Sequence, residues 1–239
     1  MQPRTARLGT TAAVSTIGLI LASGCSPAPE PERAPGASST TPSAAAPVAA
    51  LTTAQLKGLA FKDGEVPQAH EPMAVQEPRP KGSGRSFPPI SVPACQPLLD
   101  ARNGEGSIAH VFQIFNWKKN IMGGSSTLAS YEEDEAARRF AELKQALTAC
   151  RSYEGEGYVG RFEVTVRTEA APPVGDEAVA FREIIPMKLE RVERNEQFVV
   201  VRTGNTIATF TELATGKGLS FPTELISRQV ERLRDAQRP

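Results

Sequence analysis

Residues 198–210 read FVVVRTGNTIATF, and this stretch predicts a β-hairpin. Two runs of β-branched and aromatic residues flank Thr203-Gly204-Asn205. Gly and Asn accept the positive φ angles that a tight two-residue turn requires. The hairpin therefore makes antiparallel pairing the first expectation for this 239-residue chain.

Further strands are expected on the N-terminal side of the hairpin. Residues 158–168 alternate between apolar and polar side chains, and residues 178–185 form a second apolar run after a Gly-Asp-Glu turn. Residues 107–117 are rich in β-branched and aromatic side chains. Gly123-Gly124 is expected to break this strand, so that residues 125–131 pair back with it.

Helices are expected where apolar residues recur three and four positions apart. They are predicted at residues 52–61, 96–101 and 130–150 and from about residue 222 onward. The Pro-rich residues 63–94 between them predict an irregular segment with one edge strand. Because strands occur in runs between helices, the sequence predicts an α+β single domain. We expect a mostly antiparallel curved sheet with helices packed on one face, and one disulfide.

An export signal is indicated at the N-terminus. Arg4 and Arg7 precede the uncharged apolar residues 8–21, which are too few to span a bilayer as a helix. Small residues at 22–24 then precede Cys25. This arrangement resembles a bacterial lipoprotein signal peptide, which implies that Cys25 carries lipid and begins the mature chain. The alternative is an ordinary secretory peptide with an incidental cysteine.

A tether is expected after the lipid site. Residues 26–50 are rich in Ser, Pro, Ala, Thr and Gly, and they carry too little apolar surface to fold. The predicted organisation is a signal peptide over 1–24, lipidated Cys25 with a disordered tether to residue 50, and an extracytoplasmic α+β domain over 51–239. Acyl chains on Cys25 would hold this domain at the cell membrane, facing the extracytoplasmic side.

The two other cysteines, Cys95 and Cys150, are expected to form a disulfide. An even pair of cysteines in an oxidising compartment favours this bond. The competing interpretation is a metal site or a catalytic thiol. The chain has no Cys-x-x-Cys motif, and its two histidines show no ligand spacing.

Charge and motifs argue against several classes of function. Basic and acidic side chains number 27 each, and the predicted signal peptide removes two arginines, so no basic surplus indicates a nucleic-acid partner. The sequence contains no Gly-x-Ser-x-Gly, Ser-x-x-Lys or His-Glu-x-x-His motif and no phosphate-binding Gly-rich loop. His70 and His110 are better explained as surface or packed histidines than as catalytic bases. We therefore expect no enzyme activity, no cofactor and no bound metal.

The strand over residues 107–117 carries aromatic side chains at Phe112, Phe115 and Trp117. Side chains alternate along a strand, so residues 112 and 114 face one way while residues 115 and 117 face the other. One face belongs to the core, and the other is covered, exposed as a patch or used to line a cleft. Core packing is the default interpretation, and a ligand groove is the hypothesis that would give these three residues a function.

The layout resembles actinobacterial cell-envelope lipoproteins that bear a domain similar to the PknH-like extracellular sensor domain of mycobacterial kinases. The matching stretches are residues 93–99, Ala149-Cys150, residues 174–181 and residues 200–208. The sensor domains usually have a second disulfide, for which this chain has no cysteines. The resemblance implies a sensor-like fold that binds a small molecule or an envelope component.

Three functions therefore remain as expectations. The first is a membrane-anchored lipoprotein with a non-catalytic sensor-like or ligand-binding domain, which takes an apolar small molecule. The second is a structural or interaction lipoprotein that binds an envelope protein, and the third is a hydrolase.

Overall fold

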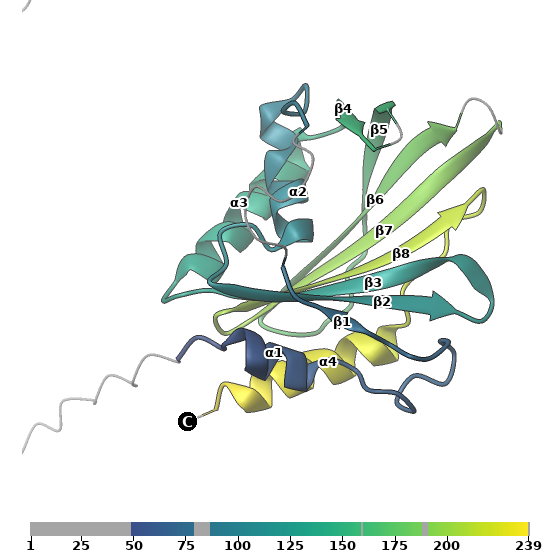
Figure 1. The fold of residues 1–239 in the computed structure, drawn as a ribbon. Coiled ribbons are helices and arrows are strands. Elements are labelled where there is room, and N and C mark those ends of the chain that lie inside the picture. The colour runs from purple at the N-terminus through teal and green to yellow at the C-terminus, as the bar shows by residue number, and fades with distance from the viewer. Residues whose placement is uncertain (1–48, 79–86, 159, 188–190, 239) are drawn as a thin grey trace, which may run out of the picture. The chain divides into compact units, whose positions relative to one another are not determined.

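The computed structural model describes residues 49–78, 87–158, 160–187 and 191–238, all within one unit that spans residues 45–239. The predicted signal peptide, Cys25 and the predicted tether up to residue 48 lie outside the described residues. The described residues form an eight-stranded antiparallel open sheet with four α-helices (Figure 1). The predicted α+β class is confirmed.

The predicted hairpin forms the two central strands of this sheet. Thr203 pairs with Thr206 beside the turn, where Gly204 has a φ of 56°. The strand order is β1-β2-β3-β8-β7-β6-β5-β4. The strands are β1 (Val75–Gln76), β2 (Ala109–Trp117), β3 (Asn120–Ser130), β4 (Ser152–Gly157), β5 (Gly160–Glu169), β6 (Glu177–Met187), β7 (Val192–Thr203) and β8 (Thr206–Thr215).

The helices cover both faces of the sheet, and this differs from the expectation of one covered face. Helices α1 (Thr53–Leu59) and α4 (Thr223–Ala236) pack on one face, and α2 (Gln96–Asn103) and α3 (Glu135–Ala149) pack on the other (Figure 1). A 3₁₀ turn, Pro93–Cys95, leads into α2.

The central strands explain why both faces need a cover. Val199 and Val201 belong to the core under α1 and α4, whereas Phe198 and Val200 belong to the core under α2 and α3. All four are buried. A strand that is apolar on both sides must be buried on both sides, so helices on one face alone would leave an apolar surface in water.

The predicted break at Gly123-Gly124 is wrong, because both glycines lie inside β3. The turn between β2 and β3 is formed instead by Lys118 and Lys119, with Trp117 paired to Asn120. A Cβ atom at Gly124 would lie 2.8 Å from both Trp117 Nε1 and Glu212 Oε2. Gly124 therefore gives these two side chains room to meet and does not end the strand.

The predicted disulfide is confirmed. Cys95 and Cys150 are bonded, with their Cα atoms 5.1 Å apart. Cys95 lies at the start of α2 and Cys150 directly follows α3, so the bond joins the two helices on one face. Strand β4, which follows Cys150, was not predicted, because Ser152–Gly157 has neither an apolar run nor a clear alternation.

Candidate functional site

A groove of about 580 Å³ lies on the part of the sheet that α2 leaves uncovered. Side chains of β2, β3, β8 and β7 form its floor, and the last residues of α2 form one wall. We call it the sheet groove and define it by Phe112, Ile114, Leu213, Arg102 and Arg194. Its size is typical of small-molecule sites in proteins.

One end of the sheet groove is apolar. Phe112 and Ile114 project from β2 and Met122 from β3. Leu213 on β8 also lines the groove, but it pairs with Glu196 and lies nearer the other end. Ile114 keeps 38% of its surface exposed, although Val200 on the same face is fully buried under the helices. The groove therefore exposes apolar side chains that a ligand could cover.

The other end of the groove carries charge in two layers. The carboxylates of Glu183 and Glu196 are buried, with 3% and 6% of their side-chain surface exposed. Arg102 and Arg194 lie above them, with 35% and 39% exposed. Arg102 Nη1 lies 3.4 Å from Glu183 Oε2 and 3.6 Å from Glu196 Oε2, and Arg194 Nη2 donates a hydrogen bond to Glu196.

Helix α2 positions Arg102 beside Glu183 and Glu196. The sheet holds the C-terminal end of α2, because Thr127 Oγ1 donates to the Arg102 carbonyl oxygen at 3.0 Å and Thr209 Oγ1 donates to that of Ala101 at 2.9 Å. These carbonyls would otherwise lack partners at the helix end. The Arg102 guanidinium also lies over the Phe198 ring, 5.6 Å from its centre.

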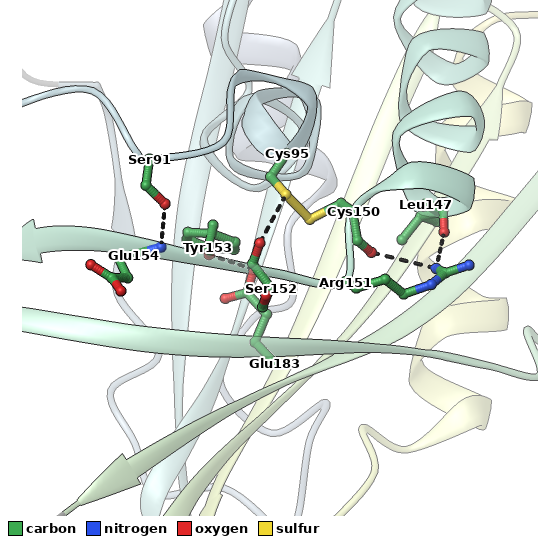
Figure 2. Close-up of a disulfide and its surroundings, with 9 residues drawn as sticks. All are labelled: Ser91, Cys95, Leu147, Cys150, Arg151, Ser152, Tyr153, Glu154 and Glu183. Atoms are coloured by element: carbon green, nitrogen blue, oxygen red, sulfur yellow. Dashed lines mark hydrogen bonds between the residues drawn. A yellow bond between two sulfur atoms is a disulfide. The ribbon is translucent and has the colours of Figure 1, made fainter.

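The disulfide lies close to Tyr153 and Glu183, one member of this cluster (Figure 2). It fixes Cys95, the residue directly before α2, and α2 carries Arg102 in its last turn. Its other end, Cys150, lies two residues before β4, which carries Tyr153. Tyr153 Oη donates a 2.8 Å hydrogen bond to Glu183 Oε1. The disulfide thus links α2 and β4, the two elements whose side chains contact Glu183.

The buried position of this cluster shifts the pKa values of its members. Burial raises the pKa of the Glu183 carboxyl, while Arg102 and the Tyr153 hydroxyl act in the opposite direction. Burial also raises the pKa of Tyr153, and the nearby Glu183 adds to this effect. Tyr153 therefore remains a protonated donor to Glu183. Burial alone would lower the pKa of Arg102, but Glu183 and Glu196 raise it.

The structure separates the three aromatic residues proposed from the sequence. Phe112 lines the sheet groove, whereas Phe115 is fully buried on the other face of β2. The Phe115 ring stacks on Trp117 at 5.0 Å and meets Phe61 and Phe221 edge-on. The predicted alternation of β2 is confirmed, and it prevents the three residues from forming one site.

Trp117 borders a second pocket, of about 600 Å³, on the α4 face. Its indole Nε1 donates to Glu212 Oε2 at 2.6 Å, and Asn120 Nδ2 donates to Glu212 Oε1 at 2.8 Å. Burial raises the pKa of Glu212 against the effect of these two donors. Trp117 therefore fixes a buried carboxylate between β2 and β8.

His110 lines the sheet groove and contacts Ser107, with 3.1 Å between Nδ1 and Oγ. The Ser107 hydroxyl donates to the Gly104 carbonyl oxygen at 2.6 Å, so its proton is already engaged. Among the described residues, no carboxylate hydrogen-bonds to His110. Burial lowers the pKa of His110, and Glu105 partly opposes this shift. The arrangement lacks the oriented acid that a Ser-His-Asp set requires.

Sequence reasoning missed the charged end of the groove. Glu183 lies inside the predicted strand 178–185, between Phe181-Arg182 and Ile184-Ile185. A charged residue within an apolar strand is a signal of a buried ion pair, because an unpaired buried charge is costly. Its partner Arg102 could not be identified in this way, because it comes from a helix 81 residues earlier.

No family model and no curated protein matches the chain. Among solved structures, the extracellular domain of PknH from Mycobacterium tuberculosis aligns with a TM-score of 0.54 and 12% identity, covering 79% of this chain and 99% of that domain. An uncharacterised protein from Mycobacterium smegmatis, an Rv0999 ortholog, aligns with a TM-score of 0.35 and 17% identity, covering 77% of this chain and 92% of its own. The first of these two alignments is the one that shows a shared fold. The described domain therefore has the fold of the PknH extracellular domain, as the sequence resemblance implied.

Proposed function

We propose that this chain is a lipid-anchored, non-catalytic domain that binds a ligand on the extracytoplasmic side of the membrane. The sheet groove is the observation that carries the proposal. It combines exposed apolar side chains at Phe112 and Ile114 with the guanidinium groups of Arg102 and Arg194. Apolar walls with a few polar groups at fixed positions are characteristic of ligand sites.

Three observations support the location outside the cytoplasm. The disulfide between Cys95 and Cys150 is of a kind that persists in oxidising compartments. A solved structure with this fold is an extracellular domain. Residues 1–24, directly before Cys25, have the form of a lipoprotein signal peptide.

Among the described residues, no helix has both the length and the apolar character needed to cross a bilayer.

The lipid anchor can be tested by replacing Cys25 with alanine. The thiol is the only site for the thioether-linked lipid in this proposal, so the Cys25→Ala protein should leave the membrane pellet and appear in the soluble exported fraction. Fractionation followed by immunoblotting measures this change. Cys150→Ser is the control, because it removes a cysteine but keeps the lipid site. Retention of Cys25→Ala in the membrane would refute the anchor.

The sheet groove can be tested with Nile red, a neutral apolar dye whose fluorescence rises in apolar sites. Replacing Ile114 with aspartate places a charge at the apolar end and should weaken dye binding roughly tenfold or more, since burying an unpaired carboxylate is costly. Ile108→Asp is the matched control, because Ile108 is 53% exposed and does not line the groove. Equal dye affinities for the two variants would count against the groove.

A protein-binding role is the second candidate. Ile121 is fully exposed near the β2–β3 turn, and Ile108 and Ile114 are exposed on β2 and the residue before it. Exposed apolar residues of this kind are common in protein interfaces. A heavier complex in native mass spectrometry of the extracted protein would favour this candidate over a small ligand.

A further inference from the structure

We infer that the ligand of the sheet groove is a small amphipathic acid, which lies across the strands with its apolar body over β2 and its anionic head at Arg102 and Arg194. This inference rests on the proposed function and names the class of ligand that the groove takes. It follows from three features of the groove: the direction of its polarity, the order of its charged layers and its unused donors.

The surroundings change from apolar at β2 to charged at β7, on a diagonal across the strands. Ile114 on β2 pairs with Ser125 on β3, which pairs with Thr211 on β8. Thr211 in turn pairs with Phe198 on β7, and Glu196 and Arg194 lie two and four residues further along β7, with Glu196 opposite Leu213. Three strand spacings of about 4.8 Å and an offset of two residues along the strand give roughly 16 Å between Ile114 and Glu196. The hydroxyl groups of Ser125 and Thr211 and the side chain of Leu213 lie between them. A ligand that lies across the sheet therefore passes from apolar to polar surroundings along its length.

The order of the charged layers selects the sign of the head group. The carboxylates of Glu183 and Glu196 are almost fully buried, whereas the guanidiniums of Arg102 and Arg194 are more than a third exposed. A ligand that enters the groove therefore meets arginine donors before it meets carboxylate oxygens. A carboxylate or phosphate matches this surface, and an ammonium group would meet like charge.

The arginines retain unused hydrogen-bonding capacity. An arginine has five N–H donors. Among the described residues, no acceptor lies within hydrogen-bond distance of Arg194 Nε, although this atom is buried. Arg102 reaches the side chain of Glu183 only through Nη1, and at 3.4 Å. The exposed part of each guanidinium can thus donate to an anion while Arg194 keeps its bond to Glu196.

The alternatives fit the groove less well. A small polar anion would leave Phe112, Ile114 and Leu213 uncovered, and a purely apolar molecule would cover the arginines without supplying an acceptor. A molecule with an apolar chain and one acidic head satisfies both ends. The structure does not separate a carboxylate head from a phosphate head, so the experiment compares the two.

Isothermal titration calorimetry of four probes with one chain length tests the inference: decanoate, decyl phosphate, decanol and decylamine. We expect decanoate or decyl phosphate to bind at least tenfold more tightly than decanol, and decylamine to bind most weakly. The stronger of the two acids identifies the head group. If decanol binds as tightly as both acids, or if decylamine binds more tightly than both acids, the inferred ligand class is wrong. The proposal that the sheet groove binds a ligand is then kept. If none of the four binds, the binding groove and the ligand class are both wrong.

A paired substitution shows whether the arginine carries the selectivity. Arg194→Gln with Glu196→Gln removes the guanidinium and its buried partner together, so the local net charge is unchanged and no unpaired carboxylate remains. We expect the affinity for the acid to fall about tenfold and that for decanol to change less than twofold. Arg138→Gln with Glu135→Gln is the matched control, since it removes an arginine–glutamate pair on α3 that does not line the sheet groove. Equal affinity for the acid in the two double variants would overturn the role of Arg194.

Discussion

Replacing Cys150 with serine is expected to lower the free energy of unfolding by about 4 kcal/mol. The disulfide closes a loop between residues 55 positions apart, and opening a loop of this size gives the unfolded chain about that much additional conformational entropy. For a domain of this size the melting temperature should fall by roughly 10 °C. Thermal unfolding followed by circular dichroism measures the change.

The disulfide prediction has an internal control. A reducing agent should lower the melting temperature of the wild-type protein to that of Cys150→Ser, and it should leave the variant unchanged. The double variant Cys95→Ser with Cys150→Ser should melt with the single variant, because both lack the same bond. Two free thiols in the untreated, folded wild-type domain would contradict the bond itself.

Replacing Phe115 with alanine is expected to destabilise the fold by about 3–5 kcal/mol, because a fully buried aromatic side chain leaves a cavity when it is removed. Its ring contacts Phe61, Trp117 and Phe221, so the loss affects the segment after α1, strand β2 and the segment before α4. Urea denaturation measures the effect. The folded fraction should bind Nile red as the wild-type protein does, since Phe115 does not line the sheet groove.

Phe112→Ala is the matched comparison, three residues away on the same strand. Phe112 is half-buried and borders the sheet groove. We expect this variant to lose dye affinity and to lose no more than about 1–2 kcal/mol of stability. If Phe115→Ala weakened dye binding more than Phe112→Ala did, the assignment of the two residues to opposite faces of β2 would be wrong.

The architecture could largely be predicted from local sequence. The Thr-Gly-Asn turn identified the β7–β8 hairpin, and the apolar spacing over 130–150 identified α3, which begins at Glu135. Compartment and cysteine number were sufficient to pair Cys95 with Cys150. In each case the signal lies within one element or depends on composition, so no three-dimensional information was needed.

Other features depend on contacts between distant residues and could not be predicted. Gly123-Gly124 looked like a strand end, yet Gly124 is required because Trp117 and Glu212 approach it from other strands. The second covered face also escaped prediction, although the unbroken run Phe198 to Val201 was its signal. An alternating strand exposes one face to water, whereas a continuous apolar run requires cover on both.

Only part of the candidate site could be predicted from the sequence. Strand alternation correctly placed Phe112 apart from Phe115 and Trp117, but it did not show which face carried a groove. That depends on how far α2 extends over the sheet, which is set by the contacts of its last turn with Thr127 and Thr209. The pairing of Arg102 with Glu183 depends on the same placement.

Native mass spectrometry of the full-length protein, gently extracted in a detergent of known mass, tests the central claim most directly. We expect a lipid-modified chain that begins at Cys25 and carries an additional small organic acid. That acid should be lost from the Ile114→Asp protein and kept by Ile108→Asp. A wild-type protein that carries no small molecule, or that leaves the membrane only within a complex with another protein, would contradict it.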